Sequence, residues 1–195
     1  MRNILILGAN GQVARRAIEL FLNETDVELT LYLRNSGRLR SVDPERARVI
    51  EGDVLDTGKL KQAMAGQDVV YANLAGDLEQ QAKSIVKAMH EAGVRRLVFI
   101  SSMGIYDEVP GEKHGSILDP YRKAAKVIED SDLDYTILRP AWFTDVDEVD
   151  YETTQKGEPF KGSIVSRKSV AALVVKLAVS PEQEVRRSLG VSKPE

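Results

Sequence analysis

The chain of 195 residues contains no cysteine, one tryptophan and two histidines. Without cysteine it can form neither a disulfide, nor a thiolate nucleophile, nor a cysteine-ligated zinc site. The two histidines, His90 and His114, lack the spacing of a metal site, and we expect no metal. Lys and Arg total 27 against 30 acidic residues and form no long basic run, so we expect no nucleic-acid partner.

Long apolar stretches are also missing. The start, "MRNILILGANG", has too short an apolar run for a signal peptide, and no stretch approaches the roughly 20 apolar residues of a membrane span. We therefore expect a cytoplasmic protein that acts on a small molecule and has no membrane partner. Nothing in the sequence indicates an oligomeric state.

Strand-like and helix-like patterns alternate along the chain. Short apolar runs typical of buried strands cover residues 4–7, 27–33, 47–52, 68–76, 95–102 and 134–140. Helical spacing covers residues 13–21, 57–65, 77–91, 121–130 and 167–179, with Thr57 as an N-cap and Gly93 as a C-cap. This order predicts an α/β fold: a doubly wound parallel sheet in one domain of residues 1–195, with a small C-terminal segment on the substrate side.

A glycine pair follows the first strand in "ILILGANGQVARRAIELFL". Gly8 allows a sharp turn, and Gly11 allows a pyrophosphate to approach backbone N–H groups at a helix N-terminus. A tight corner without a ligand would also need glycine. The position on the first strand of an α/β chain favours dinucleotide binding. We assign that role to the loop residues Gly8, Asn10, Gly11, Gln12 and Val13.

Arg34 lies about 20 residues beyond this loop, where NAD-binding sites commonly place an acid on the ribose. A guanidinium at that position suits a 2′-phosphate, and Arg38 and Arg40 follow closely. The other interpretation makes these arginines solvated turn residues. We expect NADP in preference to NAD.

Six motifs in order give the chain a family resemblance: "GANGQVA" (8–14), "EGDVLD" (51–56), "ANLAG" (72–76), "FISSMGIY" (99–106), "LDYTILRPAWF" (133–143) and "VSRKSVA" (165–171). Over nearly its whole length the chain resembles an atypical short-chain dehydrogenase/reductase with a Rossmann fold. The resemblance is to the compact NAD(P)H-binding branch that includes NmrA-like proteins and biliverdin-IXβ and flavin reductases. It implies that Asp53 and Val54 border the adenine. It further implies that Asn73, Ala75 and Gly76 line the cofactor, with Pro140 and Ala141 near the nicotinamide.

The catalytic signature of that family is incomplete here. The resemblance implies a tyrosine that exchanges the substrate proton and a lysine four residues later that lowers its pKa. Tyr121 has the right place, but position 125 is alanine, and Lys126 would point about 100° away around a helix. We keep Ser101, Ser102 and Tyr121 as candidate catalytic residues. The alternative makes the serines turn residues at a strand end and Tyr121 a wall of the pocket.

Three further segments have two interpretations each. Trp142 and Phe143 could stack on a planar aromatic ligand, but we favour a role as a roof over the core. Residues 106–116 are rich in turn formers and suit a mobile flap. The acidic run at residues 145–152 could hold a cation loosely, but such runs are more often solvated loops.

These expectations together predict an NADP(H)-dependent oxidoreductase that transfers hydride to a small planar acceptor such as a flavin or quinone. Such acceptors can take their proton from solvent, so the missing lysine is less damaging to this chemistry. The alternative is a redox sensor of the NmrA-like kind that binds NADP without turning it over.

Overall fold

Eight strands form the central sheet of the computed structural model, which describes residues 1–195. They are β1 (Asn3–Leu7), β2 (Glu28–Leu33), β3 (Ala47–Glu51), β4 (Val69–Ala72), β5 (Arg96–Ile100), β6 (Asp134–Pro140), β8 (Glu152–Thr154) and β10 (Arg187–Ser192). Their order is β3–β2–β1–β4–β5–β6–β10–β8, and every neighbouring pair is parallel except β10 with β8. The order reverses direction between β1 and β4, and such a switch point opens a crevice at the carboxyl ends of the strands.

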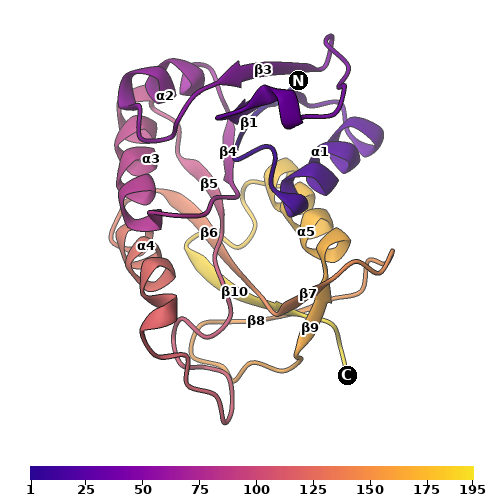
Figure 1. The fold of residues 1–195 in the computed structure, drawn as a ribbon, viewed down its shortest axis with the longest axis vertical. Coiled ribbons are helices and arrows are strands. Elements are labelled where there is room, and N and C mark those ends of the chain that lie inside the picture. The colour runs from indigo at the N-terminus through magenta and orange to yellow at the C-terminus, as the bar shows by residue number, and fades with distance from the viewer.

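Helices cover both faces of the sheet (Figure 1). On one face lie α1 (Gln12–Glu24) and α5 (Arg167–Val179); on the other lie α2 (Thr57–Met64), α3 (Leu78–Ala92) and α4 (Asp119–Glu129). The expected doubly wound Rossmann fold in one domain is confirmed. Each central strand is buried on both faces, which explains why its residues are apolar without alternation.

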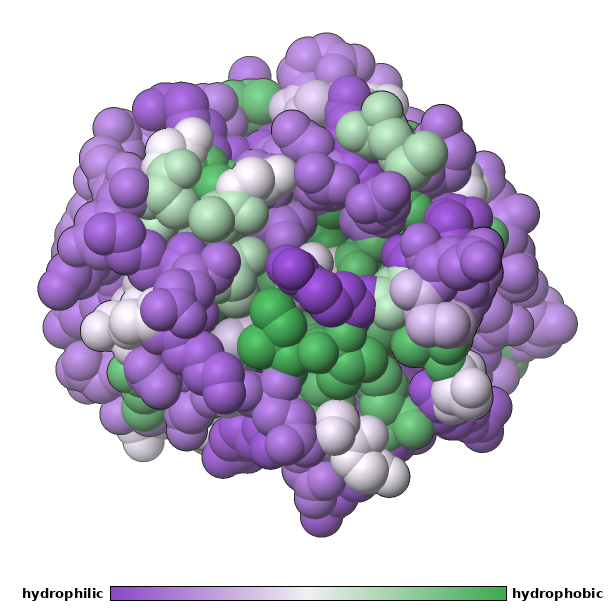
Figure 2. All heavy atoms as spheres, turned by 90° about the horizontal axis from the view of Figure 1, so that it is seen from above, coloured by the Kyte–Doolittle hydropathy of each residue, from purple (hydrophilic) through white to green (hydrophobic).

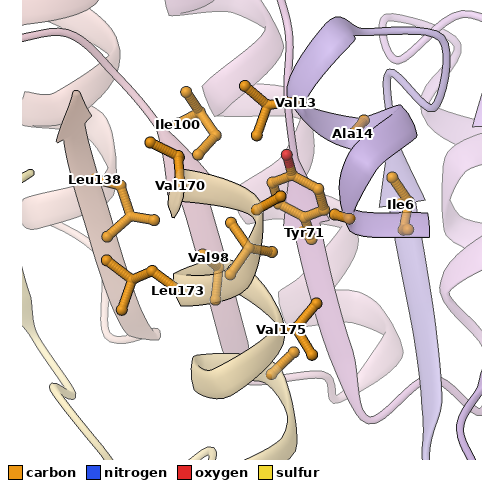
Figure 3. Packing of buried hydrophobic residues seen from close by; sticks show 14 of the residues in the cluster. Ile6, Val13, Ala14, Tyr71, Val98, Ile100, Leu138, Val170, Leu173 and Val175 are labelled. Carbon is orange, nitrogen blue, oxygen red and sulfur yellow. The ribbon is translucent and has the colours of Figure 1, made fainter. Parts of the chain in front are cut away.

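Two hydrophobic clusters, one on each face, hold the layers together. Figure 3 shows the first: Val13 of α1 and Val170 of α5 lie over Tyr71 of β4 and Ile100 of β5. Because α1 and α5 pack against each other as well as against the sheet, the glycine-containing loop before α1 rests on a rigid base.

Most element boundaries agree with expectation, and the differences have local causes. Gly93 has a φ of +73° and ends α3 as predicted, but the side chain of Asp56, not that of Thr57, caps α2 by accepting from the Lys59 N–H. Helix α4 begins at Asp119 rather than at Tyr121, because a proline in its first turn needs no hydrogen-bond acceptor.

The sequence patterns missed four strands near the C-terminus: β7 (Trp142–Thr144), β8, β9 (Ile164–Ser166) and β10. Strands β7 and β9 form a separate parallel pair beyond the end of β6. Three residues are too few for periodicity to be detected, which explains the omission of β7, β8 and β9.

Figure 2 shows one face covered mainly by hydrophilic side chains, with hydrophobic ones gathered in a hollow near its centre. None of the helices combines the length and the apolar character needed to span a bilayer.

Candidate functional site

A cavity of about 550 Å³ opens at the carboxyl ends of β1, β2 and β4, at the switch point of the sheet. Its walls are Gly8, Asn10, Gly11, Tyr32, Leu33, Arg34, Asn35, Arg38, Gly52, Asp53, Val54, Asn73, Leu74, Ala75 and Gln81. Eight of the thirteen residues that we assigned to the cofactor are among them. The structure therefore brings together motifs that are as much as 67 positions apart in the chain, from Gly8 to Ala75.

The two glycines of the first loop leave space for Asn73, the residue that follows β4. Gly8 has a φ of +77°, and the N–H groups of Gly8 and Ala9 both donate to the carbonyl of Tyr32. A Cβ at Gly11 would overlap the side-chain amide of Asn73, and one at Gly8 would overlap its carbonyl oxygen. The loop thus needs glycine to pack against Asn73, a reason that the sequence did not show.

Helix α1 begins with its first N–H groups facing this loop. Gly11 is the N-cap and has no side chain to bond them, and the first bond of the helix runs from the Arg15 N–H to the Gly11 carbonyl. Gln12 and Val13 lie in the first turn and make no backbone hydrogen bond through their N–H groups. Such a turn binds an anion through its free donors and its dipole.

Arginines line the cavity wall that follows β2. Arg34 and Arg38 are exposed, and neither belongs to an ion pair. Arg15 donates to the side-chain oxygen of Asn10 and to the carbonyl of Arg38, so it closes the wall between α1 and this loop. Arg40 lies outside the cavity. The sequence analysis missed Arg15, whose position one turn into α1 was the available signal.

The opposite wall has an orphaned acceptor. Gln81 donates through Nε2 to the carbonyl of Ala75, which leaves its buried Oε1 without a partner. Tyr32 donates to the carbonyl of Asp53 at 2.9 Å, and burial, together with Asp56 and Asp53, raises its pKa to about 12. A nucleotide base with an amino group suits this wall, because Gln81 Oε1 can accept the hydrogen bond that it lacks.

Five assigned residues lie outside this cavity: Gln12, Val13, Gly76, Pro140 and Ala141. Pro140 and Ala141 are buried, and their backbone groups bind Met103 and Val191. They hold the start of the β5–α4 connection against β6 and β10. The cavity thus corresponds to the part of the expected site for the adenosine and the pyrophosphate. Pro140 and Ala141, which we expected near the nicotinamide, lie at the end of β6, outside this cavity.

The candidate catalytic residues have three different environments. Ser101 is buried directly after β5, and its hydroxyl has no hydrogen-bond partner. Ser102 donates to the carbonyl of Met103, and Tyr121, in the first turn of α4, is half-buried against the core. None of the three lines the cavity.

The structure shows why no lysine assists Tyr121. Ala125, four residues on, is 2% exposed and packs into the core between α4 and the sheet. Lys123 is exposed, and Lys126 is bound to Asp130 at 2.8 Å on the solvent side. No ammonium group contacts the Tyr121 hydroxyl.

A buried ion pair holds the segment between β5 and α4. Arg139 of β6 is fully buried and donates to Glu108 at 2.8 Å, and Glu108 also accepts from the N–H groups of Gly104 and Tyr106. Burial alone would raise the Glu108 pKa, but these hydrogen bonds outweigh it and hold that pKa below its usual value. Residues 106–116, which we expected to suit a mobile flap, are therefore anchored at Glu108. A charged residue inside an apolar strand was the signal for this pair.

The side chain of Tyr106 takes part in the same network as Arg139. Its hydroxyl contacts Glu129 and Ser188, and the cations of Arg139 and Lys156 lie 5.0 and 4.4 Å from the ring centre. Burial, together with the hydrogen bond to the Glu129 carboxylate, raises the pKa of Tyr106 above its usual value. Tyr106 therefore stays protonated at neutral pH, and its hydroxyl is held by Glu129 and Ser188.

The segment after β6 contradicts one expectation and confirms another. Trp142 is 65% exposed and Phe143 is 37% exposed, so they do not roof the core. The acidic run is an exposed loop up to the start of β8, as expected. Its ion pairs lie at the surface: Asp145 pairs with Arg16 of α1 and Arg167 of α5, and Glu148 pairs with a lysine just beyond β10.

Several known proteins are similar to this chain in sequence and fold. The model of the NAD(P)H-binding family matches residues 8–181. A Rossmann-fold NAD(P)-binding family protein from Shigella flexneri is 48% identical, with a TM-score of 0.89 over 100% of this chain and 94% of that one. A short-chain dehydrogenase/reductase from Veillonella parvula, solved with NADP, is 33% identical, with a TM-score of 0.91 over 99% and 95%. A Bacillus subtilis protein described as an uncharacterized sugar epimerase is 25% identical over 88% of this chain and 86% of its own.

The matched residues include the glycine loop, the wall around Asp53, the β4 end and all of α5. The chain therefore shares its fold and part of its sequence with proteins described as NAD(P)-binding. The chain belongs to the NAD(P)H-binding family, as an atypical short-chain dehydrogenase/reductase.

Proposed function

We propose that the protein binds NADP(H) in the cavity at the switch point and transfers hydride to a small planar acceptor such as a flavin or a quinone. The observation that carries this proposal is the cavity itself, with helix N–H donors at one end and unpaired arginines at the other. A pyrophosphate suits the α1 N-terminus, and an adenine suits the wall with the free Gln81 acceptor.

The arginine wall supports NADP rather than NAD. Arg34 and Arg38 line the cavity without carboxylate partners, so both can bind a 2′-phosphate. The nearby acid, Glu51, is engaged by the N–H and hydroxyl of Ser36, and these bonds lower its pKa. The Veillonella relative, which was solved with NADP, supports the same choice.

The environment of Tyr121 supports an acceptor that does not need an enzymic proton donor. Reduction of a carbonyl, or oxidation of an alcohol carbon as in sugar epimerization, requires an acid or base at the oxygen. No lysine ammonium contacts the Tyr121 hydroxyl, because Ala125 fills the position four residues on and Lys126 is bound to Asp130. A bound nicotinamide would supply the hydride, and a conjugated ring can take its proton from water. Sugar epimerization, the activity named for the Bacillus relative, is therefore less favoured than hydride transfer to a planar acceptor.

The absence of an activated acid also favours a second candidate function. A redox sensor would bind NADPH and NADP⁺ in the same cavity and would need no proton relay. Its conformational response would replace turnover.

One experiment separates these functions. NADPH oxidation is measured with FMN, small quinones and small carbonyl compounds, while calorimetry measures the affinity for NADPH and NADH. We expect turnover with flavin or quinone and none with carbonyls. Tight NADPH binding without any turnover would favour the sensor, and activity confined to carbonyls would contradict the proposed acceptor.

Arg34→Ala tests the choice of cofactor in the same assay. Losing a charge-assisted contact should weaken NADPH binding by roughly 1.5–3 kcal/mol, while NADH affinity should hardly change. The matched control is Arg48→Ala, an exposed arginine on β3 outside the cavity. Equal losses for both cofactors in Arg34→Ala would mean that this residue shapes the loop and does not bind the phosphate.

A further inference from the structure

A second cavity, of about 610 Å³, runs along the outer face of α1. One wall is a helical stripe, and the facing wall is the loop after the arginines of the first cavity. The α1 stripe consists of Gln12, Arg15, Arg16, Ile18, Glu19, Leu22 and Asn23, and the facing residues are Leu39, Arg40, Ser41 and Val42. Asp145 and Arg167 complete the lining. We call this cavity the α1 groove.

The α1 groove is positively charged in a protein that is negative overall. Its lining holds four arginines and two carboxylates, whereas the whole chain has a net charge of −3. Arg16 and Arg167 share one carboxylate, that of Asp145, at 3.5 and 3.0 Å. Arg40 is exposed and belongs to no ion pair. The lining therefore has more cationic donors than carboxylates to occupy them.

Four aliphatic side chains give the α1 groove an apolar component. Ile18 is 6% exposed, and Leu22, Leu39 and Val42 are partly buried against the cluster on this face of the sheet. Arginines and aliphatic side chains thus line one space. Drug-sized ligands occupy cavities of about 300–1,000 Å³ that combine apolar walls with a few charged groups.

We propose that the α1 groove binds a small organic anion: a carboxylate or phosphate ester on an aliphatic or aromatic body. Arg16 of α1 and Arg40 of the facing loop bind the anionic group from opposite walls. The body of the ligand lies on Leu22, Leu39 and Val42. Charge complementarity favours this occupant over a neutral one.

This site is distinct from the dinucleotide cavity and does not rest on the proposed hydride transfer. The two linings have no residue in common. Arg15 separates them, because it lines the α1 groove and donates to Asn10 and Arg38, which line the other cavity. An organic anion should therefore bind while the dinucleotide cavity is filled.

The test uses the fluorescent anion 8-anilino-1-naphthalenesulfonate and full-length protein saturated with NADP⁺. We expect saturable binding at one site per chain. The double variant Arg16→Gln/Arg40→Gln should weaken it at least about tenfold, the scale of a lost charge-assisted contact. The matched control, Arg48→Gln, removes an exposed charge elsewhere and should change the affinity less than about twofold.

Displacement of the probe then defines the ligand. Octanoate or octyl phosphate should displace it, and their relative potency distinguishes a carboxylate from a phosphate ligand. Acetate and inorganic phosphate, which lack an apolar body, should not. The proposal is overturned if the probe does not bind with NADP⁺ present, if the control weakens binding as much as the double variant does, or if acetate displaces as well as octanoate. Sedimentation that shows a dimer for the wild type and a monomer for the double variant would also overturn it, because a second copy would then cover the α1 groove.

Discussion

The buried pair of Arg139 and Glu108 allows a quantitative prediction about stability. Arg139 is 0% exposed and the Glu108 side chain is 5% exposed, so neither charge is solvated. Glu108→Leu would remove the acceptor of three hydrogen bonds: from Arg139 at 2.8 Å, from the Gly104 N–H at 2.8 Å and from the Tyr106 N–H at 2.9 Å. It would also leave the guanidinium with Ser188 as its only hydrogen-bond partner.

Breaking a buried pair from one side typically costs about 3–5 kcal/mol, because the remaining charge is uncompensated. For a domain of this size each kcal/mol shifts Tm by about 2–4 °C, so Glu108→Leu should lower Tm by about 6–20 °C. Thermal unfolding followed by circular dichroism measures this change. The control Glu91→Ala breaks an exposed pair with Lys61 and should cost less than about 1 kcal/mol.

The double variant Glu108→Leu/Arg139→Met checks the stated cause. Once the uncompensated charge is gone, part of the lost stability should return, although the N–H groups of Gly104 and Tyr106 would still lack their acceptor. A loss below about 1 kcal/mol in Glu108→Leu would refute the reasoning. So would a double variant that is less stable than the single one.

Three further predictions follow from the same structure. Gly11→Val should abolish dinucleotide binding, because the new side chain collides with Asn73. The control Gly58→Ala, on the open surface of α2, should leave the affinity measured by calorimetry unchanged. Normal affinity in a folded Gly11→Val protein would contradict the loop assignment. Tyr121→Phe should slow single-turnover hydride transfer less than about tenfold, and a loss above roughly 10²-fold would identify it as a proton donor after all. The folded-state pKa of Glu108 is lowered, so its contribution to stability is complete above pH 4.5 and is lost as the pH falls through that lowered pKa. The Tm values of the wild type and Glu108→Leu should therefore converge below pH 4.5. A difference in Tm that stays constant with pH would argue against this linkage.

Local patterns in the sequence determined the architecture and the cofactor loop. Buried parallel strands are apolar on both faces, and helices carry one apolar stripe, so their alternation predicts a doubly wound sheet. Gly8 and Gly11 follow the first strand, and Arg34 follows the second, so topology alone placed them at one edge of the sheet. These inferences needed only residues close together in the chain.

Contacts between distant residues decided the rest. Glu108 and Arg139 are 31 positions apart, and only folding shows that they share a buried site. The position of Ala125 in the core, which explains the missing lysine, depends on how α4 packs against the sheet. The exposure of Trp142 depends on the pairing of β7 with β9, whose three residues carry no periodic signal. Likewise, the α1 groove exists because the loop after β2 faces α1 across a gap. Long-range packing sets which side chains are buried, paired or free, and sequence periodicity does not contain that information.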